Sequence, residues 1–216
     1  MHIALLHTAE IHVATFQAIF AGLGRPVRLT QRVEADLLEQ ARTQGTEAVR
    51  GATIAALADL AGADAVICTC STLGPLADDF ARSNPQVFRI DQPLMRAACA
   101  HGPRILVAIC LESTRAPTLD LLRDTARELG RGIRPEVILC DAAWPLFEAG
   151  DSDGFARNIA SRIDERARRG DIDCIVLAQA SMRVAAPLLA HPGVPVLTSP
   201  DIAAAHAISL ARTGGS

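Results

Sequence analysis

Two similar segments, 109 residues apart, constrain the fold of this chain more than any other feature. Residues 64–72 read DAVICTCST and residues 173–181 read DCIVLAQAS. Each is a short apolar run that ends in small polar residues, which is typical of a buried parallel strand that turns into a helix. A second pair of matching segments, 93–100 and 200–207, follows in the same order at an offset of 107 residues. These matches predict a duplicated α/β unit with pseudo-twofold symmetry.

Strand-like and helix-like segments alternate along the chain, which predicts repeated βα units with helices on both faces of mostly parallel sheets. We expect two similar Rossmann-like α/β halves, residues 1–96 and 97–199, with the active site in the cleft between them. The helix within residues 200–216 is expected to pack back on the first half. Expected strands are 3–7, 27–33, 64–69, 87–90, 104–109, 136–140, 172–178 and 194–197, and expected helices are 12–22, 35–43, 47–61, 74–81, 93–100, 118–129, 143–149, 153–169, 182–190 and 200–211.

Composition excludes several classes of function. The formal net charge of -3 lacks the basic excess of a nucleic-acid-binding surface. No apolar run approaches membrane-spanning length, so we expect a cytoplasmic protein without membrane contact. The six cysteines form no CxxC pair, which favours free thiols in a reducing compartment. No glycine-rich phosphate loop follows a strand, so nucleotide binding is not expected.

Candidate site residues lie where predicted strands end, because ligands of open α/β sheets bind at the carboxyl ends of the strands. Cys70 is the first candidate for the reacting group. The hydroxyls and backbone N–H groups around it are suited to bind a ligand. Helix capping is the structural alternative for the Ser and Thr residues, and a buried packing thiol is the alternative for Cys70. The expected substrate-binding residues are His7, Thr8, Ser71, Thr72, Ser113, Thr114, Gln179, Ala180 and Ser181.

Neither a metal site nor an organic cofactor is expected. Cys68 lies two residues before Cys70 and is interpreted as core packing, and the pair lacks further ligands. The spacing of His7, Glu10 and His12 fits no pair of ligands one helical turn apart. Asp91 follows a predicted strand and is expected to cap the next helix.

The residues after the two matched strands resemble the aspartate/glutamate/hydantoin racemase superfamily. Cys70-Ser71-Thr72 is similar to the Cys-Asn-Thr motif of its first half, and residues 177–181 align with the Leu-Gly-Cys-Thr-His motif of its second half. The stretches 105–114 and 194–200 also fit the family pattern. The resemblance implies two α/β halves, a small carboxylate-bearing substrate, no cofactor and a homodimer.

The sequence departs from the family pattern at Gln179, which occupies the place of the second active-site cysteine. Racemases of the superfamily use one thiolate to remove the α-proton and one thiol to deliver a proton to the opposite face. A carboxamide performs neither role near neutral pH. The superfamily also contains arylmalonate decarboxylases, which keep one active-site cysteine, in the second half. We therefore expect a racemase-like isomerase with Cys70 as acid/base, a decarboxylase of a malonate-type acid, or a non-catalytic member that binds small acids.

Overall fold

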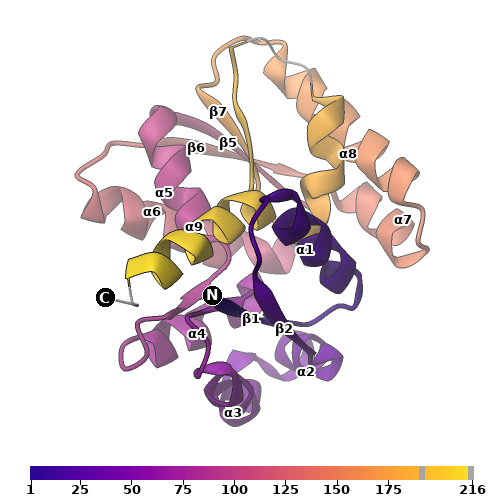
Figure 1. Ribbon diagram of the computed structural model, residues 1–216. Coiled ribbons are helices and arrows are strands. Elements are labelled where there is room, and N and C mark those ends of the chain that lie inside the picture. The colour runs from indigo at the N-terminus through magenta and orange to yellow at the C-terminus, as the bar shows by residue number, and fades with distance from the viewer. Residues whose placement is uncertain (190–192, 214–216) are drawn as a thin grey trace. The chain divides into compact units, whose positions relative to one another are not determined.

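The computed structural model describes residues 1–189 and 193–213 and divides the chain into two compact units. The first unit consists of Met1–Asp91 and the segment from Pro200 onward, and the second unit is Gln92–Ser199. Each unit is a four-stranded parallel sheet with helices on its faces (Figure 1). The predicted α/β class with two similar halves is confirmed.

The first unit has the strand order β2-β1-β3-β4. Helices α2, α3 and α4 cover one face of the sheet, where Leu57 packs with Leu6 and Val66. Helices α1 and α9 cover the other face, where Phe16 lies 5.6 Å from the ring of His7. Its elements are β1 (His2–His7), α1 (Ile11–Gly22), β2 (Arg28–Val33), α2 (Ala35–Gln44), the 3₁₀ helix η1 (Thr46–Val49), α3 (Arg50–Leu60), β3 (Ala65–Cys68), the 3₁₀ helix η2 (Ser71–Leu73), α4 (Gly74–Ala81), β4 (Val87–Arg89) and α9 (Ser199–Thr213).

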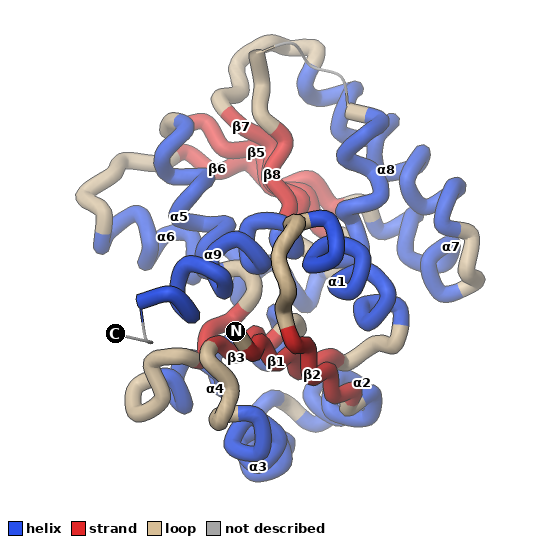
Figure 2. The backbone as a smooth tube through the Cα atoms, viewed as in Figure 1, coloured by secondary structure: helices blue, strands red, loops and turns tan. Residues whose placement is uncertain are grey.

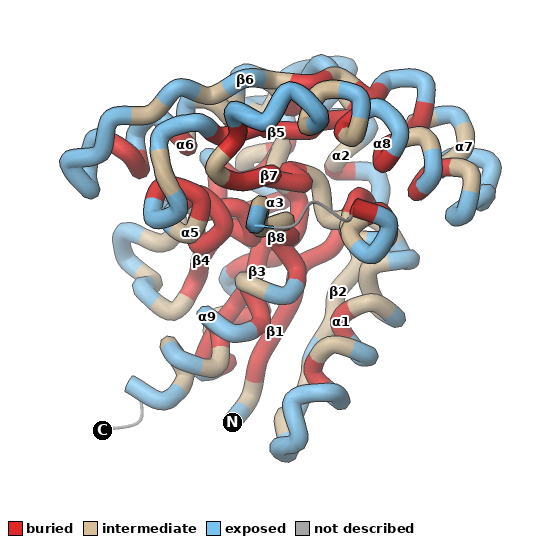
Figure 3. The backbone as a smooth tube through the Cα atoms, turned by 90° about the horizontal axis from the view of Figure 1, so that it is seen from above, coloured by how far each residue is buried: buried red, intermediate tan, exposed pale blue. Residues whose placement is uncertain are grey.

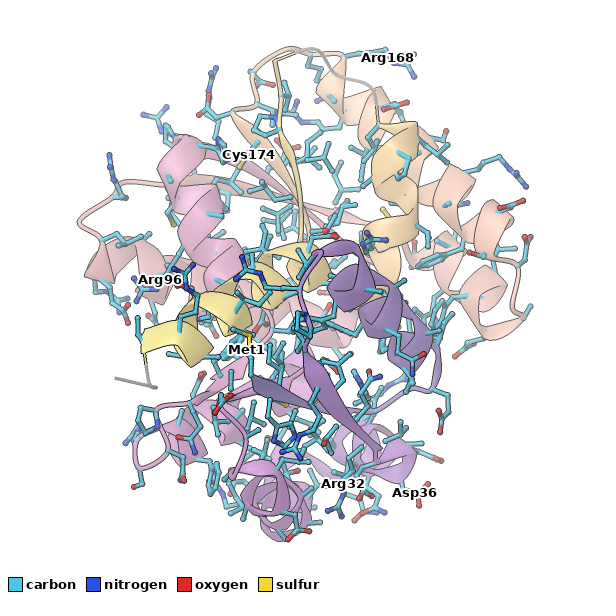
Figure 4. The ribbon with its side chains drawn as sticks, viewed as in Figure 1. Met1, Arg32, Asp36, Arg96, Arg168 and Cys174 are labelled. Carbon is cyan, nitrogen blue, oxygen red and sulfur yellow. The ribbon has the colours of Figure 1, made fainter. Side chains whose placement is uncertain are left out.

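The second unit repeats this order as β6-β5-β7-β8. Helix α8 covers one face of the sheet, and α5 covers the other, where the Cys174 thiol lies 3.8 Å from the Ala98 carbonyl oxygen. Cys174 lies within the sheet region, whereas Arg168 projects away from the end of α8 (Figure 4). The elements are α5 (Gln92–His101), β5 (Arg104–Ile109), η3 (Glu112–Thr114), α6 (Arg115–Glu128), β6 (Arg134–Leu139), η4 (Asp141–Ala143), α7 (Trp144–Glu148), α8 (Ser152–Ala167), β7 (Cys174–Leu177), η5 (Ala180–Leu188) and β8 (Val196–Thr198).

Strand registers show how closely the two sheets correspond. Val66 pairs with Val87 in the first sheet, and Ile175 pairs with Val196 in the second. The offset of 109 residues that separates β3 from β7 therefore also separates β4 from β8. The central strands β1, β3, β5 and β7 are buried, whereas the edge strands β2 and β6 are more exposed (Figures 2 and 3). The carboxyl ends of matching strands thus occupy matching places in the two sheets.

One predicted helix is wrong in type. The segment expected to form a helix over residues 182–190 forms the 3₁₀ helix η5 instead, and Ala190 lies outside the described residues. Pro187 lies within it, and a proline inside an α-helix removes one hydrogen bond and clashes with the carbonyl four residues earlier. The expected helix 47–61 is likewise divided into η1 and α3. Within the described ranges, no helix is long and apolar enough to cross a membrane.

Candidate active site

Cys70 lies in the turn that leads from β3 into η2. Its backbone is extended, with φ −100° and ψ 111°, and its carbonyl oxygen accepts a hydrogen bond of 3.1 Å from the Leu73 N–H. The residue is 8% exposed, and both Ser71 and Thr72 are partly exposed. Because the first N–H groups of a helix have no partner within it, those of Ser71 and Thr72 are available to an anion. The turn therefore joins a thiol, two hydroxyls and two N–H donors.

A buried ion pair between Arg89 and Asp91, at the end of β4, contacts this turn. Arg89 Nε and Nη2 donate hydrogen bonds of 2.6 and 2.9 Å to the two carboxylate oxygens of Asp91. Arg89 also donates to Asp78 at 3.0 Å and to the Ser71 carbonyl oxygen at 3.4 Å. Burial opposes the charge of Arg89, but the carboxylates of Asp91 and Asp78 outweigh it and raise the pKa of the guanidinium. Asp91, expected to cap a helix, thus directs both oxygens to Arg89.

His7 links three strands of the first sheet. Its Nδ1 lies 2.8 Å from Thr69 Oγ1 and its Nε2 lies 2.9 Å from Gln31 Oε1. The side chain is fully buried, and burial lowers the pKa of His7, so the ring is neutral at pH 7. Burial together with His7 lowers the pKa of His12 to about 4. Thr8, which follows His7, is 8% exposed.

Gln179 occupies the same place after β7 that Cys70 occupies after β3. Its backbone angles, φ −104° and ψ 140°, are close to those of Cys70. Its Oε1 accepts hydrogen bonds from the N–H groups of Cys110 and Leu111, the latter at 3.3 Å. The carboxamide oxygen is therefore bound to the backbone that follows β5, and only the amide NH₂ remains to contact a ligand.

The hydroxyls expected in the second unit differ in their environment. Thr114 is nearly buried, and its hydroxyl donates a hydrogen bond of 2.7 Å to the Leu111 carbonyl oxygen. Ser113 is exposed, whereas Ala180 and Ser181 at the start of η5 are half-buried. Ser113 and Ser181 thus keep hydroxyls that solvent reaches, while the proton of Thr114 is already engaged.

The cysteines are free thiols, and all six are buried. Burial raises the pKa of Cys68 to about 12, that of Cys140 to about 11 and that of Cys174 to about 12, so these groups stay protonated at neutral pH. Cys68 is fully buried and its Sγ lies 3.8 Å from the Cys70 carbonyl oxygen. Among the described residues, no three His, Cys, Asp or Glu side chains are grouped to hold a metal ion.

The fold and the sequence define the class of this protein. The sequence model of the Asp/Glu/hydantoin racemase family matches residues 10–207, and the chain therefore belongs to that family. No curated protein matches the chain.

Solved structures of racemases and of a decarboxylase share the fold. Aspartate racemase from Picrophilus torridus is 16% identical with a TM-score of 0.69, covering 99% of this chain and 94% of its own. Glutamate racemase isoform RacE1 from Bacillus anthracis is 13% identical with a TM-score of 0.74, covering 99% of this chain and 82% of its own. A glycine-to-cysteine mutant of arylmalonate decarboxylase, in a sulfate-associated form, is 17% identical with a TM-score of 0.62, covering 100% of this chain and 95% of its own. At these identities the likeness concerns the fold.

Sequence reasoning missed two features of the site. The first is the ion pair between Arg89 and Asp91, whose signal is a charged residue inside the otherwise apolar run 87–90, with a carboxylate two positions later. The second is the contact of Gln179 with the backbone after β5, which has no signal in the sequence. Both features concern how the two matching turns are held.

Proposed function

We propose that this racemase-like chain catalyses proton transfer, without a cofactor, at the carbon next to the carboxylate of a small acid. Cys70 is the acid/base group and acts on one face of that carbon. Three features support the proposal: the place of Cys70 after β3, the donors of Ser71 and Thr72 beside it, and membership of the racemase family.

The turn after β3 has the groups that such a reaction requires. Removal of an α-proton places negative charge on the substrate carboxylate, and fixed N–H and hydroxyl donors stabilise that charge. The Cys70 thiolate takes the proton and becomes a thiol, and the electron pair of the C–H bond passes into an enediolate. Return of a proton from the same thiol restores the starting configuration. The remaining expected substrate contacts, His7, Thr8, Ser113, Thr114, Gln179, Ala180 and Ser181, belong to the same proposal.

The environment of Gln179 supports a reaction in which protons are transferred on only one face of the α-carbon. Its oxygen is engaged by two backbone N–H groups, and a carboxamide does not titrate near neutral pH. The position that matches Cys70 therefore supplies no second acid or base. Inversion at the α-carbon requires a group other than Gln179.

The same observation favours a second candidate, decarboxylation of a malonate-type diacid. Loss of carbon dioxide leaves the bonding electron pair in an enediolate, and one protonation completes the reaction. The Cys70 thiol delivers that proton and regains another from water. This reaction needs one proton donor on one face, which is what the chain retains.

Deuterium incorporation tests the proposal directly. The protein is incubated in deuterated water with aspartate, glutamate, a 5-substituted hydantoin and phenylmalonate, and the α-position is followed by proton NMR and chiral chromatography. We expect α-deuterium with retained configuration, or a single enantiomer of the monoacid from phenylmalonate. Thermal stabilisation by one of these compounds without exchange or product would instead indicate a protein that only binds small acids.

Two cysteine variants complete the experiment. Cys70→Ala is expected to abolish exchange and decarboxylation while the fold, followed by circular dichroism, is retained. Cys99→Ala removes a thiol from α5 and is expected to keep both activities. Undiminished turnover in folded Cys70→Ala would refute the role of Cys70.

A further inference from the structure

We propose that Arg89, held by Asp91, is the positioning residue that aims the turn after Cys70 at the substrate carboxylate. This inference rests on the proposed function and names a part of the site that does not touch the substrate. Arg89 donates a hydrogen bond to the carbonyl oxygen of the Ser71–Thr72 peptide. The N–H group of the same peptide is one of the donors expected to bind the anion.

The guanidinium is held in one orientation. The Arg89 and Asp91 side chains are 4% and 1% exposed, and they form two parallel hydrogen bonds. A bidentate pair of this kind fixes the plane of the guanidinium, which a single contact does not. With Nε and Nη2 bound to Asp91 and Nη1 bound to Asp78, the second proton of Nη2 is directed at the Ser71 carbonyl oxygen.

This contact acts on the next N–H group together with the turn itself, because the Gly74 N–H also donates a hydrogen bond to the Ser71 carbonyl oxygen. The carbonyl of Ser71 and the N–H of Thr72 belong to the same planar trans peptide and point in opposite directions. Because the Gly74 N–H and Arg89 both hold the carbonyl oxygen, the Thr72 N–H is directed away from the ion pair. A charged donor on the carbonyl also polarises the peptide, which makes its N–H a stronger donor to an anion.

Gly74 gives the guanidinium its room. A Cβ atom at this position would overlap Cζ, Nε and Nη2 of Arg89, so the residue after η2 must lack a side chain for the ion pair to reach the turn. The guanidinium, which carries the positive charge, therefore lies in direct contact with the backbone of Gly74.

In the described part of the second unit, the positions that match Arg89 and Gly74 hold other residues. At the offset of 109 residues, Arg89 corresponds to Thr198 and Gly74 corresponds to Arg183. A threonine cannot form the fork that Arg89 forms. Among the described residues, the arginine fork is therefore found at the turn that contains Cys70, and the matching position near Gln179 holds a threonine.

A purely structural ion pair is the competing explanation. Buried ion pairs contribute little net stability, although removing one partner is strongly destabilising. The two explanations differ in what they predict for anion binding by the folded protein. A structural pair changes the unfolding midpoint only, whereas a positioning pair also changes the affinity of the turn and the KM of the reaction.

Malonate serves as the probe in a titration followed by amide NMR. In the wild type, malonate is expected to shift the Ser71 and Thr72 amide resonances. In Arg89→Gln we expect the dissociation constant to rise about tenfold, because a charged hydrogen bond behind the donor is lost. Arg89→Lys keeps the charge without the fork and should recover part of the affinity. Gly74→Ala leaves every charge in place but displaces the guanidinium, and should weaken binding as much as Arg89→Gln.

Arg50→Gln is the matched control. Arg50 lies in the same unit, but its side chain is exposed and its hydrogen bonds go to Glu47 and to Asp79, the neighbour of Asp78, rather than to the turn. We expect its affinity for malonate and its KM to stay within twofold of the wild type. If Arg89→Gln does not fold, Gly74→Ala and Arg89→Lys decide the question.

The outcomes separate the inference from the proposed function. Wild-type affinity and KM in folded Gly74→Ala or Arg89→Gln would overturn the inference and leave the role of Cys70 standing. Malonate binding that depends on Arg89, in a protein that never exchanges α-hydrogens, would overturn the catalytic function and leave the inference standing. A wild type that neither binds malonate at the turn nor exchanges would overturn both.

Discussion

Replacing Gln179 with methionine tests whether its carboxamide is a structural group of the second unit. Methionine has nearly the same length and shape but accepts no strong hydrogen bond. The N–H of Cys110, a residue that is 1% exposed, then loses its acceptor, and the methionine side chain keeps water away. Leaving a buried N–H unpaired costs about 1–3 kcal/mol. The bond to Leu111 is longer, at 3.3 Å, and that residue is partly exposed, so it adds little. We expect a loss of about 2 kcal/mol in the free energy of unfolding.

Urea denaturation of Gln179→Met, followed by circular dichroism, measures this loss. Gln179→Glu is the matched control, because a carboxylate offers oxygens to the same two N–H groups, and its stability is expected to lie closer to that of the wild type. Amide hydrogen exchange supplies a local readout, since the Cys110 N–H should exchange faster in the methionine variant only. A methionine variant as stable as the wild type, with a protected Cys110 N–H, would refute the reasoning.

Three further predictions concern the site and its support. Gln179→Cys places a thiol at the position that matches Cys70, and chiral analysis of exchanged substrate should show inversion that the wild type lacks; inversion already present in the wild type would contradict the one-sided scheme. The folded pKa of His12 is about 4, below its ordinary value of 6.5, so the stability it contributes is present above pH 6.5 and is lost as pH falls toward 4. Urea denaturation should show a loss of up to about 3 kcal/mol over this range that is smaller in His12→Gln, and equal losses would contradict the assignment. Gly102 has φ +146°, and a Cβ there would lie 2.6 Å from the Asp173 carboxylate, so Gly102→Ala should lower the stability by about 1–3 kcal/mol. An unchanged unfolding midpoint would contradict this prediction and show that the Asp173 side chain, which binds Arg104, moves aside without cost.

The parts of the fold that follow from local pattern were predictable. The apolar runs before Cys70 and Gln179 are alike, and their equal offset from the next strand reflects a shared parallel register. The two turn residues consequently have similar backbone angles, which the sequence match predicts. The duplicated topology and the place of both turns could therefore be derived from residue pattern alone.

Other features depend on contacts between residues distant in sequence. The 3₁₀ geometry of η5 departs from the expected helix, although Pro187 was visible in the sequence as a helix breaker. The carboxamide of Gln179 reaches a backbone 69 residues away, and no local pattern encodes that distance. Arg89 contacts the Ser71 carbonyl 18 residues earlier, which depends on the pairing of β3 with β4. Local sequence thus gives the position of each turn, but not the groups that hold it.

The discontinuous first unit has a consequence for folding during synthesis. The second unit is one continuous stretch, Gln92–Ser199, so all of its strands are synthesised before α9. Phe88 of β4 packs edge-on against His206 of α9, with ring centroids 4.8 Å apart, and it stays uncovered until that helix arrives. Domains usually fold in the order of their synthesis. Here the unit that begins first is completed last, and a chain truncated before α9 would contain all strands of the second unit but only part of the first unit, which carries Cys70.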